Sequence, residues 1–255
     1  MVDVSALQSA APVIGRLVVV GLGLIGGSFA KGLRASGLCR EVVGVDLDPQ
    51  SRKLAVELGV VDRCEEDLAA ACQGADVIQL AVPILAMEKM LGRLAGMNLG
   101  QAILTDVGSA KGNVVRAATA AFGGMPSRFV PGHPIAGSEQ SGVEASNADL
   151  FRRHKVILTP LDQTDPAALA VVDRLWRELG ADVEHMQVER HDEVLAATSH
   201  LPHLLAFGLV DSLAKRNENL EIFRYAAGGF RDFTRIAGSD PVMWHDIFLA
   251  NREAV

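Results

Sequence analysis

The sequence has few cysteines, no long apolar run and no excess of basic residues, and each absence excludes a class of protein. Its three cysteines, in 255 residues, include no closely spaced pair, which predicts a reduced, cytoplasmic protein without a disulfide framework. No segment of about 18 residues is apolar and free of charge, so no membrane span is expected. The first residues lack the basic start of an export signal, so no such signal is expected. The formal charge of -7 argues against a nucleic-acid partner, because such binding needs clustered basic residues.

What is present is typical of a folded globular protein, with 49% hydrophobic and 22% charged residues. Between residue 16 and about residue 186, apolar runs rich in β-formers alternate with helical stretches. Because these runs are continuously apolar and helices separate them, they predict a parallel sheet covered on both faces. The predicted strands are 16–21, 41–46, 76–83, 102–108, 128–133 and 155–160, and the predicted helices are 25–37, 49–58, 84–95 and 109–122.

The pattern changes near residue 186. Segment 191–215 has helical periodicity, and the remainder is helical with glycine-rich breaks. Pro202 lacks an N–H and should free the Thr198 carbonyl, which predicts a kink in this helix. The fold class is therefore predicted as α/β: a Rossmann-type, doubly wound parallel sheet in residues 1–186, then a mostly α-helical domain in residues 187–255.

A glycine-rich stretch, VVVGLGLIGGS, joins the first predicted strand to the first helix. Its glycines allow a tight turn and the close approach of a pyrophosphate to the free N–H groups of the helix. Asp46 ends the second strand, where a carboxylate can hold the adenine ribose hydroxyls. That carboxylate would repel a 2′-phosphate, which favours NAD over NADP, although Arg52 is nearby. The predicted cofactor-binding residues are Gly21, Gly23, Leu24, Ile25, Gly26, Asp46, Val82 and Ser109.

Ser109 and His133 each follow a predicted strand, so both are expected at the sheet edge where ligands bind. Ser109, in LTDVGSAKG, either points toward the nicotinamide or only caps the next helix. His133, in PGHPIAGSEQSG, could be structural, as most histidines are, but its ordinary pKa of about 6.5 suits a base that takes a proton from an alcohol. The residues thus predict a dinucleotide-dependent enzyme with His133 as the candidate base.

The motifs GLGLIGGS, DVGSAKG, GHPIAGSEQSG, SHLPH and FRDFTRIAGSDPVMW, in this order, resemble the prephenate/arogenate (cyclohexadienyl) dehydrogenases of tyrosine biosynthesis. The resemblance implies oxidative decarboxylation of prephenate to 4-hydroxyphenylpyruvate, of arogenate to tyrosine, or of both, with NAD as hydride acceptor. It implies that His133 bonds the ring hydroxyl and that Ser109 bridges His133, this hydroxyl and the nicotinamide. It also implies a homodimer formed through the helical half.

The resemblance extends to residues that would bind the substrate. His203 is implied to contact the substrate side chain, whereas His200, on the same helix face, is more often structural. Arg235 resembles the arginine that binds a substrate carboxylate, because its planar fork can donate two hydrogen bonds. No metal site is expected, since neither an HExxH motif nor a cysteine pair is present. The predicted substrate-binding residues are His203, Arg235, Trp244, Glu139, Asp232 and His200, with Trp244 as a pocket wall and Glu139 and Asp232 as groups that orient Arg235.

Two alternatives remain at this point. Another β-hydroxyacid dehydrogenase with the same two domains would be expected to use a lysine in the helical domain, where Lys215 is the candidate. A non-catalytic NAD-binding redox sensor would bind the cofactor without turnover, and it would leave His133, His203 and Arg235 unexplained. The chain ends at Val255 within a predicted helix, so it is expected to be a trimmed chain or a part of a longer polypeptide.

Overall fold

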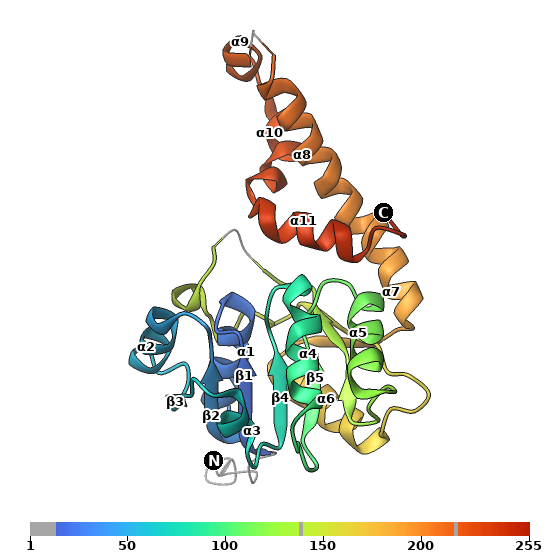
Figure 1. Ribbon diagram of the computed structural model, residues 1–255. Coiled ribbons are helices and arrows are strands. Elements are labelled where there is room, and N and C mark those ends of the chain that lie inside the picture. Colours follow the sequence, from blue (N-terminus) through green and yellow to red (C-terminus); the bar gives the residue numbers. More distant parts are fainter. Residues whose placement is uncertain (1–13, 138–139, 217–218) are drawn as a thin grey trace, which may run out of the picture.

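The computed structural model describes residues 14–137, 140–216 and 219–255, and their N-terminal part forms a layered α/β unit (Figure 1). Six parallel strands lie in the order β3-β2-β1-β4-β5-β6, which is the order of dinucleotide-binding folds. The chain places β2 and β3 on one side of β1 and then β4, β5 and β6 on the other side. The carboxyl ends of β1 and β4 therefore flank the crevice where such sheets bind ligands. The strands are β1 (Ile14–Val20), β2 (Cys39–Val45), β3 (Arg63–Cys64), β4 (Val77–Leu80), β5 (Ile103–Asp106) and β6 (Phe129–Val130).

Helices cover both faces of this sheet, as the continuous apolar strands predict. Leu17 and Val19 of β1 join one buried cluster, whereas Val18 and Val20 join another on the opposite face. Successive strand residues point to opposite faces, so a strand buried on both faces is apolar throughout. The helices of this part are α1 (Leu24–Ala35), α2 (Pro49–Glu57), α3 (Leu68–Cys72), α4 (Met87–Ala95), α5 (Gly112–Phe122) and α6 (Pro166–Glu178).

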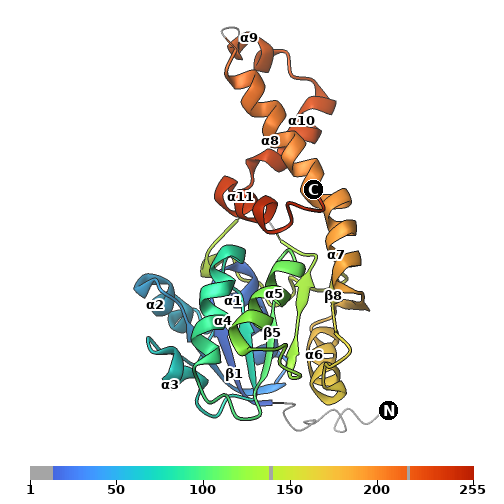
Figure 2. The same ribbon diagram turned by 45° about the vertical axis from the view of Figure 1, so that its right-hand side comes forward.

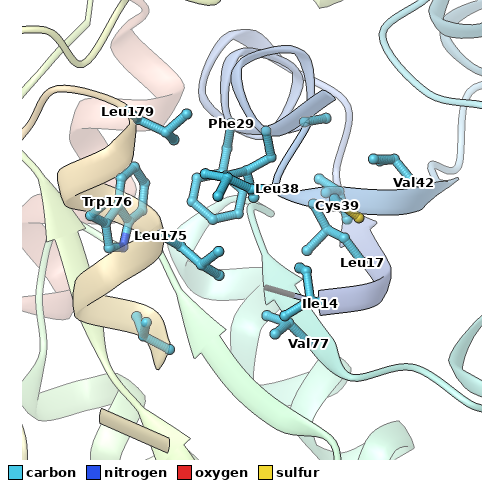
Figure 3. Packing of buried hydrophobic residues seen from close by; sticks show 14 of the residues in the cluster. Ile14, Leu17, Phe29, Leu38, Cys39, Val42, Val77, Leu175, Trp176 and Leu179 are labelled. Carbon is cyan, nitrogen blue, oxygen red and sulfur yellow. The ribbon is translucent and has the colours of Figure 1, made fainter. Parts of the chain in front are cut away.

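The first cluster packs α1 and α6 on one face of the sheet (Figure 3). Phe29 of α1 and Trp176 of α6 have ring centroids 4.5 Å apart, and both side chains are buried. On the same side of the fold, Asp48 accepts hydrogen bonds from the first N–H groups of α2, which begins at Pro49. Such a start is typical of an Asp-Pro pair, because the aspartate caps the free N–H groups and proline fits the first helical position.

The predicted strand 128–133 is wrong as a single element. After β6 the chain leaves the large sheet, and β7 (Gly132–Pro134) pairs antiparallel with β8 (Lys155–Leu158), which pairs in turn with β9 (Asp182–His185). Pro131 and Pro134 flank His133, and a proline donates no ladder hydrogen bond, which is consistent with such short strands. His133 therefore lies in a small second sheet beside the end of β5.

The helical part begins with α7 (Val188–Leu195), which continues through a π-helical turn, η4 (Ala196–His200), into α8 (Leu201–Ala214). The π-helical turn lies directly before Pro202, so the predicted irregularity is present as a widened turn. The continuous helix Val188–Ala214 is long and apolar enough, by length and composition alone, to cross a membrane, and 22% of its apolar window is buried.

The remaining helices fold back along α8 toward the sheet. They are α9 (Asn219–Arg224), α10 (Gly228–Thr234), the 3-10 turn η5 (Arg235–Gly238) and α11 (Pro241–Ala250). In both views α8, α9 and α10 extend away from the sheet, while α11 lies over its nearer end (Figures 1 and 2). Trp244 and Ile247 of α11 belong to the buried cluster that includes Ile84 and Met87 after β4. This packing sets α11 above the ligand-binding edge of the large sheet.

Candidate active site

The turn between β1 and α1 is shaped for close approach of a ligand. Gly21 has φ +97°, and a Cβ there would lie 2.3 Å from the Ala81 carbonyl oxygen. A Cβ on Gly26 would lie 2.1 Å from the Gly21 oxygen, whereas one on Gly23 would meet no atom within 4 Å. The space beside Gly23 is thus open, and the first N–H groups of α1, beginning at Leu24, have no acceptor within the helix. This arrangement fits a pyrophosphate.

Asp46 lies at the end of β2, where its carboxylate holds the glycine turn in place. It accepts hydrogen bonds from the N–H of Leu22 at 2.8 Å and of Asp48 at 2.9 Å. Arg52, the residue that could favour NADP, donates to the Asp46 carbonyl oxygen at 2.9 Å and forms an ion pair with Glu66. Because this guanidinium is bound within the protein beside a carboxylate, the site favours a ribose hydroxyl over a 2′-phosphate.

A buried ion pair ties the end of β5 to β7. Lys111 and Asp106 pair through their side chains, both 0% exposed, and Lys111 Nζ also donates to the Gly132 carbonyl oxygen at 2.6 Å. Asp106 further accepts from the N–H of Gly108 at 2.8 Å and of Gly132 at 3.2 Å. Burial lowers the pKa of Lys111, and the neighbouring Asp106 carboxylate partly offsets this. The residue before His133 is therefore fixed to the β5 edge by two side chains.

Ser109 does not cap the helix that follows it, so that alternative is wrong. Helix α5 begins at Gly112, and the Asp192 carboxylate accepts from the N–H of Lys111 and of Gly112, each at 2.8 Å. Ser109 is half-buried in the bend between β5 and α5, and Val82 is half-buried just after β4. Both residues lie at the carboxyl ends of central strands, where ligands bind in such sheets.

His133 is held from behind by a second histidine. Its Nδ1 lies 2.9 Å from Nε2 of His191, which comes from α7, and the Nδ1 of His191 lies 2.8 Å from an Asp192 carboxylate oxygen. His191 is fully buried, whereas His133 is 8% exposed. Among the residues that the structure describes, none bonds the Nε2 of His133. This nitrogen is consequently the one available to a ligand.

Burial keeps this group of histidines neutral near pH 7. It lowers the pKa of His133 well below 6.5, and the neighbouring His191, Lys111 and His200 lower it further. Burial also lowers the pKa of His191, although the hydrogen bond to Asp192 opposes the effect. A neutral imidazole has a free lone pair, so His133 can accept a proton at neutral pH.

A second group of residues comes from the helical part. His203 of α8 stacks on Trp244 of α11, with ring centroids 3.5 Å apart, and its Nδ1 donates to the Ser199 carbonyl oxygen at 2.8 Å. Burial lowers the pKa of His203, the hydrogen bond to the Ser199 carbonyl opposes this, and the positive charge of Arg235 lowers the pKa further. The Trp244 indole N–H is buried and has no partner among the described residues.

The other predicted substrate residues are placed differently. His200 is 1% exposed and its Nδ1 lies 3.0 Å from Asn251 Nδ2, so its position favours a structural role. Asp232 is exposed on α10, three residues before Arg235. Glu139 lies outside the described residues. Over residues 14–137, 140–216 and 219–255, no three metal-ligating side chains are grouped to hold an ion.

Comparison with known proteins identifies the chain. Residues 29–185 match the nucleotide-binding domain of prephenate dehydrogenase, and residues 187–255 match its dimerization domain. The chain belongs to the prephenate dehydrogenase family. It is 38% identical to the cyclohexadienyl dehydrogenase of Zymomonas mobilis, covering 94% of this chain and 82% of that one. It is also 38% identical to the prephenate dehydrogenase of Bacillus subtilis, again over 94% of this chain but only 65% of the relative.

A solved structure agrees with this result. The prephenate dehydrogenase of Aquifex aeolicus, in complex with hydroxyphenyl propionate and NAD+, superposes with a TM-score of 0.88 at 42% identity, covering 97% of this chain and 85% of that one. The chain is thus an NAD-dependent oxidoreductase of this family. The predicted fold class and cofactor are confirmed, and the two alternative functions, another β-hydroxyacid dehydrogenase and a non-catalytic sensor, are not supported.

Sequence reasoning missed the residues that hold His133. His191 and Asp192 were contained in a predicted helix, and Asp106 and Lys111 in a quoted motif, but none was singled out. The LTDVGSAKG motif could have indicated the ion pair between Asp106 and Lys111, because charged residues that are buried at the end of an apolar strand need a partner of opposite charge. Nothing local indicates that His191 contacts His133, since 58 residues separate them.

Proposed function

We propose that this enzyme catalyses the NAD-dependent oxidative decarboxylation of prephenate to 4-hydroxyphenylpyruvate, of arogenate to tyrosine, or of both. The observation that carries the proposal is the position of His133 at the cofactor edge, neutral and with its Nε2 free of hydrogen bonds within the described residues. Residues 1–186 would hold the cofactor, and residues 187–255 would close over the substrate. The cytoplasm is the proposed location, because the three cysteines are free.

The chemistry follows from what His133 can do. When bound, NAD supplies the acceptor for the hydride that leaves the carbinol carbon. Neutral His133 takes the proton of the ring hydroxyl at Nε2, and Ser109 is proposed to bond the same hydroxyl and keep it in line with that nitrogen. Loss of carbon dioxide then leaves an aromatic ring, whose stability makes the reaction irreversible.

The substrate carries two negative charges in an acidic protein, so it needs placed donors. We assign one carboxylate to Arg235, because guanidinium binds a carboxylate through two parallel hydrogen bonds. His203 would contact the side chain, and Trp244, whose indole N–H has no partner among the described residues, would form the wall beside it. Asp232 and Glu139 would orient Arg235, whereas His200 would have a structural role.

A homodimer would bury the apolar face of α8. Leu201, Leu204 and Leu205 lie on one helix face, and Leu205 is 55% exposed. Exposed contiguous leucines are typical of an interface, and residues 187–255 match a dimerization domain. Replacement of Leu205 by Asp should shift the protein from dimer to monomer in sedimentation equilibrium. An unchanged dimer would place the interface elsewhere.

Initial rates with prephenate and with arogenate, each with NAD and with NADP, test the proposed reaction. NAD should support turnover of at least one acid, with NADP much less effective. The variant His133→Asn should lose about 100-fold to 10 000-fold in kcat, the usual contribution of a general base, while still binding NAD. The exposed His154→Asn serves as the matched control. Oxidation of neither acid, or near-normal turnover in His133→Asn, would contradict the proposal.

A further inference from the structure

The candidate base and the two side chains behind it lie in one hydrogen-bonded line. From the crevice inward these are His133 of β7, then His191 of α7, then Asp192, joined by contacts of 2.9 and 2.8 Å. The two imidazole rings meet edge to face, with centroids 5.1 Å apart and planes at 64°. Only the first ring is accessible, because His191 is fully buried. The proposed reaction uses His133 but assigns nothing to the two groups behind it.

The innermost group, Asp192, is held as a carboxylate. It accepts from His191 and from the N–H of Lys111 and Gly112 at the start of α5. Burial alone raises the pKa of Asp192, but the hydrogen bonds from His191 and from the two backbone groups outweigh it and lower this pKa. The positive end of the α5 dipole also favours a negative charge. An ionised carboxylate accepts hydrogen bonds and donates none.

This fixed acceptor determines where the protons lie on both rings. His191 must carry its proton on Nδ1, facing Asp192, so in the neutral ring its Nε2 has only a lone pair. The neighbouring nitrogen of His133 must then be the donor, which places the proton of His133 on Nδ1. The Nε2 of His133 is left unprotonated. The carboxylate therefore selects, through two rings, the tautomer in which His133 is a base toward the crevice.

We propose that His191 and Asp192 form a proton relay that holds His133 in its basic tautomer and shares the proton it receives. The inference rests on the proposed function only for the source of that proton. As the substrate O–H bond breaks, an N–H bond forms at Nε2 of His133. The N–H bond at Nδ1 of His133 then breaks as one forms at Nε2 of His191. The positive charge comes to lie on His191 beside the Asp192 carboxylate. After the product leaves, the two transfers run in reverse and Nε2 of His133 releases the proton to solvent.

The charged groups around the relay are consistent with rings that are neutral at rest. Lys111, packed from the β5 edge, lowers the pKa of both His133 and His191. His200, from the π-helical turn, lowers that of His133, whereas Asp106 opposes the effect on His191. Asn251 donates to the Asp192 backbone oxygen at 2.9 Å and fixes the end of α7 from the C-terminal side. The relay is thus enclosed by α5, α7, η4 and the end of α11.

Nitrogen NMR of the 255-residue protein, labelled with 15N in its histidines, tests the tautomers without any substrate. The variants His133→Asn and His191→Gln assign the two signals. Protons on Nδ1 of both rings are expected, and Asp192→Asn should move the proton of His191 away from Nδ1. A proton on Nε2 of His191 in the unmodified protein would overturn the relay. This result does not depend on which acid, if any, the enzyme oxidises.

Kinetics of two His191 variants test the role in turnover. Glutamine can accept the hydrogen bond from His133 but cannot take its proton, so His191→Gln should lose about 10-fold in kcat. Phenylalanine can do neither, so His191→Phe should lose on the order of 100-fold to 10 000-fold. Both should keep the KM values for substrate and NAD. The matched control is His245→Gln, an exposed histidine with the same Nδ1 contact to the next residue, Asp246.

The pattern of these values separates a relay from a merely structural contact. A structural role would lower the unfolding temperature and raise the KM values, with equal loss of kcat in both variants. Wild-type kcat in His191→Phe, or equal losses for Gln and Phe, would overturn the proposal. A graded loss of kcat at constant KM supports it. Loss of activity in His133→Asn with the NMR tautomers as expected would leave the proposed function and the relay both intact.

Discussion

The buried ion pair between Lys111 and Asp106 gives the sharpest stability prediction. Replacing Lys111 with Met keeps the length and apolar stem of the side chain but removes its charge. The Asp106 carboxylate, which is 0% exposed, then has no cation beside it. The Gly132 carbonyl oxygen also loses the Lys111 donor. Breaking a buried pair from one side costs about 3–5 kcal/mol, because the remaining charge stays desolvated. We therefore expect the free energy of unfolding to fall by about that amount.

Thermal and urea unfolding measure this loss. For a chain of this size, about 1 kcal/mol lowers Tm by about 2–4 °C, so Lys111→Met should lower Tm by about 6–20 °C. The matched control is Lys215→Met, which removes an exposed ion pair with Asp211 and should cost less than about 1 kcal/mol. The double variant Lys111→Met with Asp106→Asn leaves no unpaired charge, so it should be more stable than Lys111→Met alone.

A loss in Lys111→Met as small as that in Lys215→Met would refute the reasoning, because it would mean that water reaches the Asp106 carboxylate. A double variant less stable than the single variant would refute the charge argument in another way. It would show that Asp106 acts mainly through the N–H groups of Gly108 and Gly132.

Three further predictions follow from the same site. Because burial lowers the pKa of His133 well below 6.5, kcat should stay constant as the pH falls through 6.5 and should decline only well below that value. A pH profile of kcat that bends near pH 6.5 would contradict this. Burial also lowers the pKa of His200 to about 4, so the unfolded state binds more protons than the folded state between about pH 6.5 and pH 4. The free energy of unfolding should therefore have its full value above pH 6.5 and fall by on the order of 3 kcal/mol toward pH 4. Urea unfolding over this range measures the change, and a flat profile would mean that His200 is solvated. Arg235→Gln should raise KM for the acid by a factor equivalent to about 1.5–3 kcal/mol with NAD affinity unchanged, and an unaltered KM would show that another cation binds the carboxylate.

The cofactor half of the fold was predictable because its signals are local. The order of strands and helices follows from the alternation of apolar runs, and the turn at Gly21 follows from a backbone conformation that glycine adopts without strain. The β7 strand was not separated from β6, because its pairing with β8 is antiparallel and distant. Three residues that follow one proline and end in another carry no periodicity of their own. The predicted start of α5, at residue 109, lies before the observed start at Gly112, because the cap of this helix, Asp192, comes from another helix.

By itself, the sequence determined a parallel sheet with a dinucleotide turn at one edge, and it placed Ser109 and His133 after strands of that sheet. Burial on two faces and the permitted φ of glycine are properties of short segments, which a sequence records directly. Only the tertiary structure decided what stands behind His133. Hydrogen bonds act over about 3 Å, and the partner, His191, is 58 residues away along the chain. The packing of α7 against the start of α5 brings these residues together, and no single segment contains that information.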